Sequence, residues 1–267
     1  MGRGGSEDCL ALLTDSFDSS TKILSNAMKR SDCIAVAFFL LVCLLVLLFP
    51  WGMTEDGNVR WMPVLEGCFS GEWTGLTRFG GVVQAYPYLM GFLKVGILAT
   101  FGELLKARMK TGRWHTPDLF PKFLVWGLYG MLFTLVFALF ATGVQAVSRQ
   151  GLWFASSKPY AEMSFWENVR TGFSISLWCN LIFCYPMMLA HEWFNVSIAA
   201  RKPVPGATFF AALPAQVWGS FLPKTIVWFW IPAHTVTFCL PPEFRVLMSA
   251  FLSLALGFLL SIHAARK

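Results

Sequence analysis

Charged residues are scarce in this chain. Asp, Glu, Lys and Arg make up 13% of its 267 residues, whereas 56% are hydrophobic. Average soluble domains carry about a quarter charged residues. A water-soluble fold of this length could not bury so much apolar surface, because much of any protein's exterior must face water. The composition therefore excludes an ordinary soluble globular protein and predicts a lipid environment.

Motifs of catalysis, nucleotide binding and metal binding are also missing. The sequence has no GxGxxG loop, Walker loop, GxSxG elbow or CxxC pair. The His191-Glu192 pair begins a zinc-protease-like string, but Asn195 stands where the second histidine would be needed. The seven cysteines lie mostly within apolar runs and indicate no disulfide framework. We therefore predict no enzyme, no cofactor and no metal site.

The net charge of +6 does not indicate a nucleic-acid partner. The Lys and Arg residues are scattered among loops, with no basic face that also carries base-stacking aromatic residues. The 12 Trp and 26 Phe are typical of lipid-facing surfaces and interfacial belts. We predict the lipid bilayer, and no nucleic acid, as a partner.

Long apolar runs recur from residue 33 to the C-terminus, and about 20 mostly apolar residues suffice to cross a bilayer. We predict six spans, at residues 33–49, 87–105, 123–147, 172–190, 223–240 and 244–262. An apolar stretch bounded by Pro and Gly, residues 207–222, is expected to lie along the membrane interface. The predicted fold class is all-α, a polytopic transmembrane bundle of about six helices after a polar N-terminal tail at residues 1–32.

The distribution of positive charge predicts the topology, because Lys and Arg prefer the cytoplasmic side. With both termini inside, the outside loops hold few of them, namely Arg60, Arg78, Arg149, Lys158 and Arg170. We interpret the first span as a retained signal anchor, because its apolar core is longer than that of a cleaved signal peptide. Since targeting signals are missing, we favour a bacterial cytoplasmic membrane, with a mitochondrial or peroxisomal membrane as the alternative.

Small residues form stripes at helical spacing in two spans. The third span carries Gly127, Gly130, Thr134, Ala138 and Ala141 on one face, and the sixth carries Ser249, Ser253, Gly257 and Ser261. Helices in lipid associate through close packing of small residues, so both stripes predict helix–helix contact, with pore lining as the alternative.

Five polar residues lie inside apolar runs or directly beside them and are the candidates for a solute pathway or polar core: Lys94, Glu103, Asn180, His191 and His234. An ionisable group at membrane depth usually faces a cavity or a partner. Lys94, in the middle of its run, needs a carboxylate, carbonyl groups or water from another helix or from solvent. Glu103 either pairs with Lys106 one turn away or belongs to a pathway. His191 follows a kink expected at Pro186.

Three motifs in the second part of the chain occur in a recognisable order. They contain Pro87, Gly96, Gly102, Pro186, Trp230, Phe238, Pro242 and Arg245. In this order they resemble the signature of the Mpv-seventeen family, small membrane proteins of the mitochondrial inner membrane and the peroxisome with bacterial relatives. The resemblance covers roughly residues 86–267 and leaves residues 33–85 as an extra N-terminal helix and loop. It implies a compact helical bundle and a channel or small-solute role.

Several polar positions depart from that family pattern. Glu103 stands in place of Asp, and Asn180-Leu181 in place of Asp-Gln. His234 and Thr237 stand where Gln and Asn are expected. The resemblance therefore carries over no family-specific polar site.

Two functions fit these observations. The first is a channel or transporter for small polar or anionic solutes, in which Lys94 supplies the electrostatic field. The alternative is a non-transporting membrane scaffold or membrane-homeostasis factor, which needs only the small-residue stripes. A homo-oligomer is compatible with both.

Overall fold

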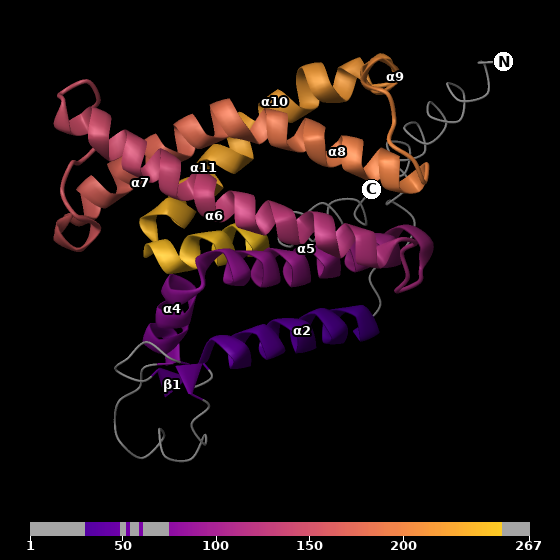
Figure 1. Cartoon of the computed structure of the whole chain (residues 1–267), viewed down its shortest axis with the longest axis horizontal. Helices are drawn as coiled ribbons and strands as arrows, with labels where there is room; N and C mark the ends of the chain where they lie inside the picture. The colour runs from indigo at the N-terminus through magenta and orange to yellow at the C-terminus, as the bar shows by residue number, and fades with distance from the viewer. Residues whose placement is uncertain (1–29, 49–51, 54–58, 61–74, 253–267) are drawn as a thin grey trace.

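The computed structural model describes residues 30–48, 52–53, 59–60 and 75–252, and these are largely helical (Figure 1). The all-α fold class is confirmed. The helices are α2 (Arg30–Leu48), α4 (Gly75–Ala85), α5 (Pro87–Thr111), α6 (Leu119–Arg149), η2 (Tyr160–Glu162), α7 (Phe165–Cys179), η3 (Asn180–Cys184), α8 (Tyr185–Ala199), α9 (Gly206–Ala211), η4 (Val217–Phe221), α10 (Leu222–Thr225), η5 (Ile226–Trp230) and α11 (Ile231–Cys239). Residues 242–252 form a further helix. A short ladder pairs β1 (Gly52–Met53) with β2 (Val59–Arg60) in antiparallel orientation.

Three helices are long and apolar enough to cross a membrane: Pro87–Arg108, Leu119–Arg149 and Phe165–Ala199. They contain the second, third and fourth predicted spans. Large apolar side chains point away from the bundle, as Leu139 on α6 and Trp228 on η5 do with 64% and 83% of their surfaces exposed. A surface of this kind is stable in lipid. These helices therefore give the described part of the chain the character of an integral membrane protein.

The other three predicted spans have different outcomes. The first falls on α2, whose apolar part in the described residues, Asp32–Leu41, is too short to count as a span. The fifth falls on the helical stretch from η4 to α11, which is not among the three. Most of the sixth lies outside the described residues. The stretch at residues 207–222 is interrupted by a non-helical turn at 212–214, so its second half joins the helix that leads to α11.

Prolines shape two of the long helical segments. A π-helical turn ends two residues before Pro186, Pro223 and Pro232 in turn, at η3, η4 and η5. A helix-interior proline lacks an N–H, and its ring clashes with the carbonyl four residues earlier. In all three cases that carbonyl belongs to the π-helical turn, where wider winding accommodates the ring. The irregularity expected at Pro186 therefore lies in η3, and the chain stays helical through Ala199.

Close packing holds α5 against α6, and Figure 1 shows the two helices side by side. A Cβ atom on Gly130 would lie 2.1 Å from the carbonyl oxygen of Gly91, so only glycine fits there. Gly127 likewise faces the ring of Phe92. The part of the small-residue stripe formed by Gly127, Gly130 and Thr134 thus makes the predicted helix–helix contact.

The N-terminal helix α2 is attached to this pair through α5. Arg108 Nε donates a 2.8 Å hydrogen bond to Asp32 Oδ1, and both side chains are buried. The rings of Phe39 and Phe101 stack with their centroids 3.7 Å apart. The helix outside the family resemblance therefore packs directly onto the rest of the bundle.

Candidate functional site

A central cavity of about 330 Å³ lies between α5, α6, the α7–α8 segment and the helical stretch from η4 to α11. All three π-helical turns contribute to its wall, including Asn180 of η3, Trp218 of η4 and Trp230 of η5. Aromatic and sulfur-containing side chains dominate the rest of the lining, among them Phe133, Phe137, Phe183, Cys179, Cys184, Met187 and Met188. π-helical turns are frequent at functional sites. The three π-helical turns that precede prolines therefore line the same cavity.

One side of this cavity carries a buried polar cluster. His234 Nδ1 donates to Asn180 Oδ1 at 3.1 Å, and Asn180 Nδ2 donates to the carbonyl oxygen of Ser176 at 2.8 Å. Ser176 Oγ in turn donates to the carbonyl oxygen of Ile231 at 2.7 Å. Asn180 is only 1% exposed. The structure thus joins two of the predicted polar residues, Asn180 and His234, in one hydrogen-bonded group between α7 and α11.

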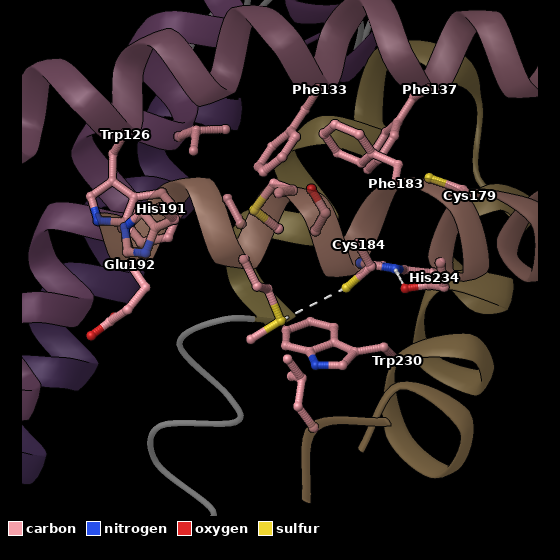
Figure 2. Close-up of a pocket in the computed structure, with 18 of the residues that line it drawn as sticks. Trp126, Phe133, Phe137, Cys179, Phe183, Cys184, His191, Glu192, Trp230 and His234 are labelled. Atoms are coloured by element: carbon pink, nitrogen blue, oxygen red, sulfur yellow. Dashed lines mark hydrogen bonds between the residues drawn. The ribbon is translucent and has the colours of Figure 1, made fainter. Parts of the chain in front are cut away.

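His191 lies toward another part of the cavity, beside Trp126, as Figure 2 shows. The two rings have centroids 4.1 Å apart. His191 Nδ1 accepts from Asn195 Nδ2 at 3.3 Å, so the neutral imidazole carries its proton on Nε2. In the described residues, His191 Nε2 and Trp218 Nε1 are two of four buried side-chain atoms without a hydrogen-bond partner, the others being Thr100 Oγ1 and Trp153 Nε1. The His191 and Trp218 donors belong to residues that line the cavity and are suited to an acceptor on a bound solute.

A second, smaller cavity of about 200 Å³ adjoins α4, α5, α6 and the helix at residues 242–252. We call it the basic cavity because Lys94 and Arg245 line it, together with Glu243. Lys94 Nζ donates to the backbone carbonyl of Glu243 at 3.3 Å and lies 5.9 Å from the centre of the Phe79 ring. Its partner comes from another helix, as expected. Lys94 stands only two turns into α5, however, closer to the helix start than the middle of the run suggested.

Glu103 has a different partner from the one predicted. Its Oε2 lies 4.0 Å from Lys122 Nζ on α6, and no ion pair with Lys106 forms within the described residues. Both partners line a third cavity of about 150 Å³, to which Asn195 also belongs. The sequence suggested an intrahelical pair, but the close approach of α5 and α6 brings Lys122 within reach. Glu103 therefore bridges two helices.

A shared residue connects two of the cavities, and a hydrogen bond between lining residues connects the third. Phe137 lines both the basic cavity and the central cavity. Asn195 lines the third cavity and holds His191 of the central one. The polar residues predicted from the sequence are thus distributed over a row of cavities instead of forming one cluster.

The residues of the family motifs take separate places. Pro87 begins α5, Gly96 lies against Phe123, and Pro186 follows η3. Gly102 stands on α5 next to Glu103. Trp230 lines the central cavity, Phe238 packs its ring 5.0 Å from that of Phe137, and Pro242 and Arg245 line the basic cavity. Lys94 and Arg245, singled out for different reasons, therefore meet at one cavity.

Sequence reasoning missed Phe137 and Trp218. Nothing in the sequence distinguishes Phe137 from the other phenylalanines, because its role depends on where two cavities meet. Trp218 has a usable signal, since it lies in the π-helical turn before Pro223. Cys179 and Cys184 line the central cavity as free thiols, and the described residues contain no group of three His, Cys, Asp or Glu side chains that could hold a metal ion.

Comparison with protein-family models, curated proteins and solved structures gives no match for this chain. The resemblance to the Mpv-seventeen family therefore stays a prediction.

Proposed function

We propose that this membrane protein is a channel or transporter for small polar or anionic solutes, and that its path runs through the row of cavities. The observation that carries the proposal is the position of Phe137. Its side chain is 6% exposed and lines the basic cavity and the central cavity at once. The Phe137 ring therefore borders two spaces of solute size, and in the proposed path a change of its rotamer connects them.

The central cavity suits an organic solute better than a hydrated ion. Its wall is mainly apolar, whereas hydrogen-bonding groups come from a few residues such as Asn180, His191 and Trp218. Binding sites for small molecules commonly combine apolar walls with a few convergent polar groups. The solute is expected to be a small organic molecule that presents hydrogen-bond acceptors.

Flux through reconstituted liposomes tests the proposal. Purified full-length chain is incorporated, and uptake of radiolabelled erythritol and methanesulfonate is compared with uptake by protein-free liposomes. We expect uptake above that background and a further increase for Phe137→Ala, which removes the ring between the cavities. Phe120→Ala is the matched control, because Phe120 stands on the same helix with 68% of its surface exposed. If wild type and Phe137→Ala both fold but give only background uptake, the proposed path is ruled out.

The alternative, a non-transporting scaffold, is favoured by the exposed aromatic residues. Trp166 on α7 and Trp228 on η5 have 75% and 83% of their surfaces exposed and could contact other helices in the membrane. A water-soluble thiol reagent separates the two functions in a variant whose only cysteine is Cys184. Labelling in intact membranes, with protection by solute, supports a hydrated path, whereas an unreactive Cys184 in folded protein supports the scaffold.

A further inference from the structure

The basic cavity contains more positive than negative charge. Lys94 and Arg245 each carry one positive charge, and Glu243 carries the only negative charge in the lining. We propose that this cavity binds a small monovalent oxoanion between Lys94 and Arg245. The inference rests on the proposed function and names the class of solute that the path selects.

Both cations are buried. Lys94 and Arg245 are each 8% exposed. A buried charge is costly unless it is paired or hydrogen-bonded. Among the described residues, however, the ion pairs within 4.0 Å include neither side chain. Glu243 acts on both cations at longer range, and an anion in the cavity would neutralise the positive charge that remains.

The contacts that the two side chains do make leave donors free. Lys94 Nζ has three donors and gives one to the carbonyl oxygen of Glu243. The guanidinium of Arg245 has five and gives its Nε–H to the carbonyl oxygen of Leu240 at 2.9 Å. The rings of Tyr160 and Phe238 lie 5.6 and 5.8 Å from its central carbon and hold the group where the basic cavity adjoins a neighbouring cavity of about 280 Å³, which Arg245 also lines. A positioned guanidinium with free N–H groups matches the planar, two-pronged geometry of an oxoanion.

The Glu243 side chain extends toward α4. Its Cγ and Oε1 lie 3.1 and 3.4 Å from the point where a Cβ on Gly80 would be. Glu243 thereby contacts α4 and forms no ion pair with Lys94 or Arg245 in the described residues. Two cations and one carboxylate leave a charge of plus one, which a monovalent anion neutralises. A divalent anion would leave uncompensated negative charge at a buried site.

The cavity also adjoins the first turn of the helix at residues 242–252, through Pro242 and Glu243. The N-terminal end of a helix carries a partial positive charge, which adds to the attraction for an anion. This contribution is secondary to the two side chains.

Equilibrium dialysis with radiolabelled methanesulfonate tests the proposal directly. This probe is a small oxoanion that stays fully ionised and monovalent. The full-length chain in neutral detergent is dialysed at constant ionic strength, and saturable binding is expected. Loss of one charged hydrogen-bond donor should weaken binding roughly tenfold to a hundredfold in Lys94→Met and Arg245→Gln. Lys224→Met and Arg170→Gln, which change exposed residues by the same charge, are expected to bind like wild type.

The conservative variants separate anion binding from folding. Lys94→Arg and Arg245→Lys keep the charge, so they should retain measurable binding even if the neutral variants fail to fold. Binding that is unsaturable, or equal in wild type and folded Lys94→Met, overturns the proposal. Undetectable binding to wild type and to both charge-conserving variants overturns it as well.

The phosphodiester of a lipid headgroup presents the same oxoanion chemistry as a free solute. A second arm therefore titrates short-chain phosphatidylglycerol against bound methanesulfonate. Binding of methanesulfonate in lipid-free detergent supports the free solute, whereas binding of phosphatidylglycerol alone overturns it. Erythritol flux without methanesulfonate binding would contradict the anion site, whereas the proposed solute path would remain supported. Methanesulfonate binding without flux of any solute would sink the path and leave the site standing.

Discussion

The α5–α6 contact and the α7–α11 contact are both close, but different forces hold them. Between α5 and α6 the backbones meet at Gly91 and Gly130, and the Thr134 hydroxyl donates back to the Gly130 carbonyl of its own helix. Between α7 and α11, side chains cross the interface instead. Ser176 Oγ donates to the carbonyl oxygen of Ile231 at 2.7 Å, and His234 Nδ1 donates to Asn180 at 3.1 Å.

The α5–α6 pair is therefore a rigid frame, whereas the α7–α11 pair forms an adjustable wall of the central cavity. Helices in lipid gain little from burying apolar surface, so they associate through shape or through hydrogen bonds. The shape-fitted α5–α6 pair tolerates no added atom at Gly130 and carries Lys94 and Phe137 at fixed spacing. The hydrogen-bonded α7–α11 pair positions Asn180 and His234 at the central cavity. Interhelical hydrogen bonds in membranes contribute modestly, about 0.6 kcal/mol on average, so this wall costs less to rearrange.

Gly130→Ala should have the largest effect. The new Cβ would stand 2.1 Å from the Gly91 carbonyl oxygen and 2.7 Å from its carbon, which are backbone atoms that cannot rotate away. The helices must separate, and we expect a loss of about 3 kcal/mol or more in the free energy of unfolding. Unfolding in mixed micelles of mild detergent and SDS, followed by tryptophan fluorescence, measures it.

Gly143→Ala on the same helix is the matched control. Nothing lies within 4 Å of its added Cβ. Alanine is the better helix former by about 1 kcal/mol, so this variant should equal or exceed wild-type stability. Equal stability of the two alanine variants would remove the argument for a shape-fitted frame.

Gly172→Ala makes the same change at the α7–α11 interface, and its effect should be smaller. The added Cβ would lie 2.9 Å from Cys239 Sγ and 3.0 Å from the Thr235 carbonyl oxygen. The backbone nitrogen of Cys239 would lie at 3.3 Å. The thiol can rotate, and the two backbone contacts are longer than those at Gly130, so we expect a loss of about 1–2 kcal/mol in the same unfolding assay.

A second substitution identifies the clash. Cys239→Ala in the Gly172→Ala background should recover part of the loss, because it removes the nearest of the three close atoms. A Gly172→Ala loss as large as that of Gly130→Ala would mean that α7 and α11 are also shape-fitted.

The frame could be predicted from the sequence, and the reason is geometric. Gly127, Gly130 and Thr134 recur at helical spacing, so one face of small residues is certain once the segment is helical. Lipid-exposed apolar runs also show three of the spans directly. These features depend on neighbours in the sequence, so periodicity is sufficient to find them.

The cavities could be predicted only in part. Lys94 and Glu243 are 149 residues apart, and the hydrogen bond between them depends on how the last described helix packs against α5. For Glu103, the local partner Lys106 was the natural choice, but the approach of α5 and α6 replaced it with Lys122. Contacts between side chains on different helices depend on how the helices pack. The residue types in the sequence alone do not predict that packing.

The pair formed by Asn180 and His234 should give the smallest effect, and a double-mutant cycle measures it directly. Asn180→Leu, His234→Leu and the double variant are unfolded in the same assay, and the coupling is the departure from additivity. We expect about 0.6 kcal/mol and at most about 1.7 kcal/mol, the range found for interhelical hydrogen bonds in membranes.

A distant pair sets the baseline for this cycle. Asn180→Leu combined with Leu139→Ala, which changes a lipid-facing residue, should be additive within about 0.5 kcal/mol. If the coupling between Asn180 and His234 exceeded about 3 kcal/mol, the α7–α11 wall would resist rearrangement as strongly as the glycine contact. The adjustable part of the proposed path would then have to be Phe137, whose side chain lines both the basic cavity and the central cavity.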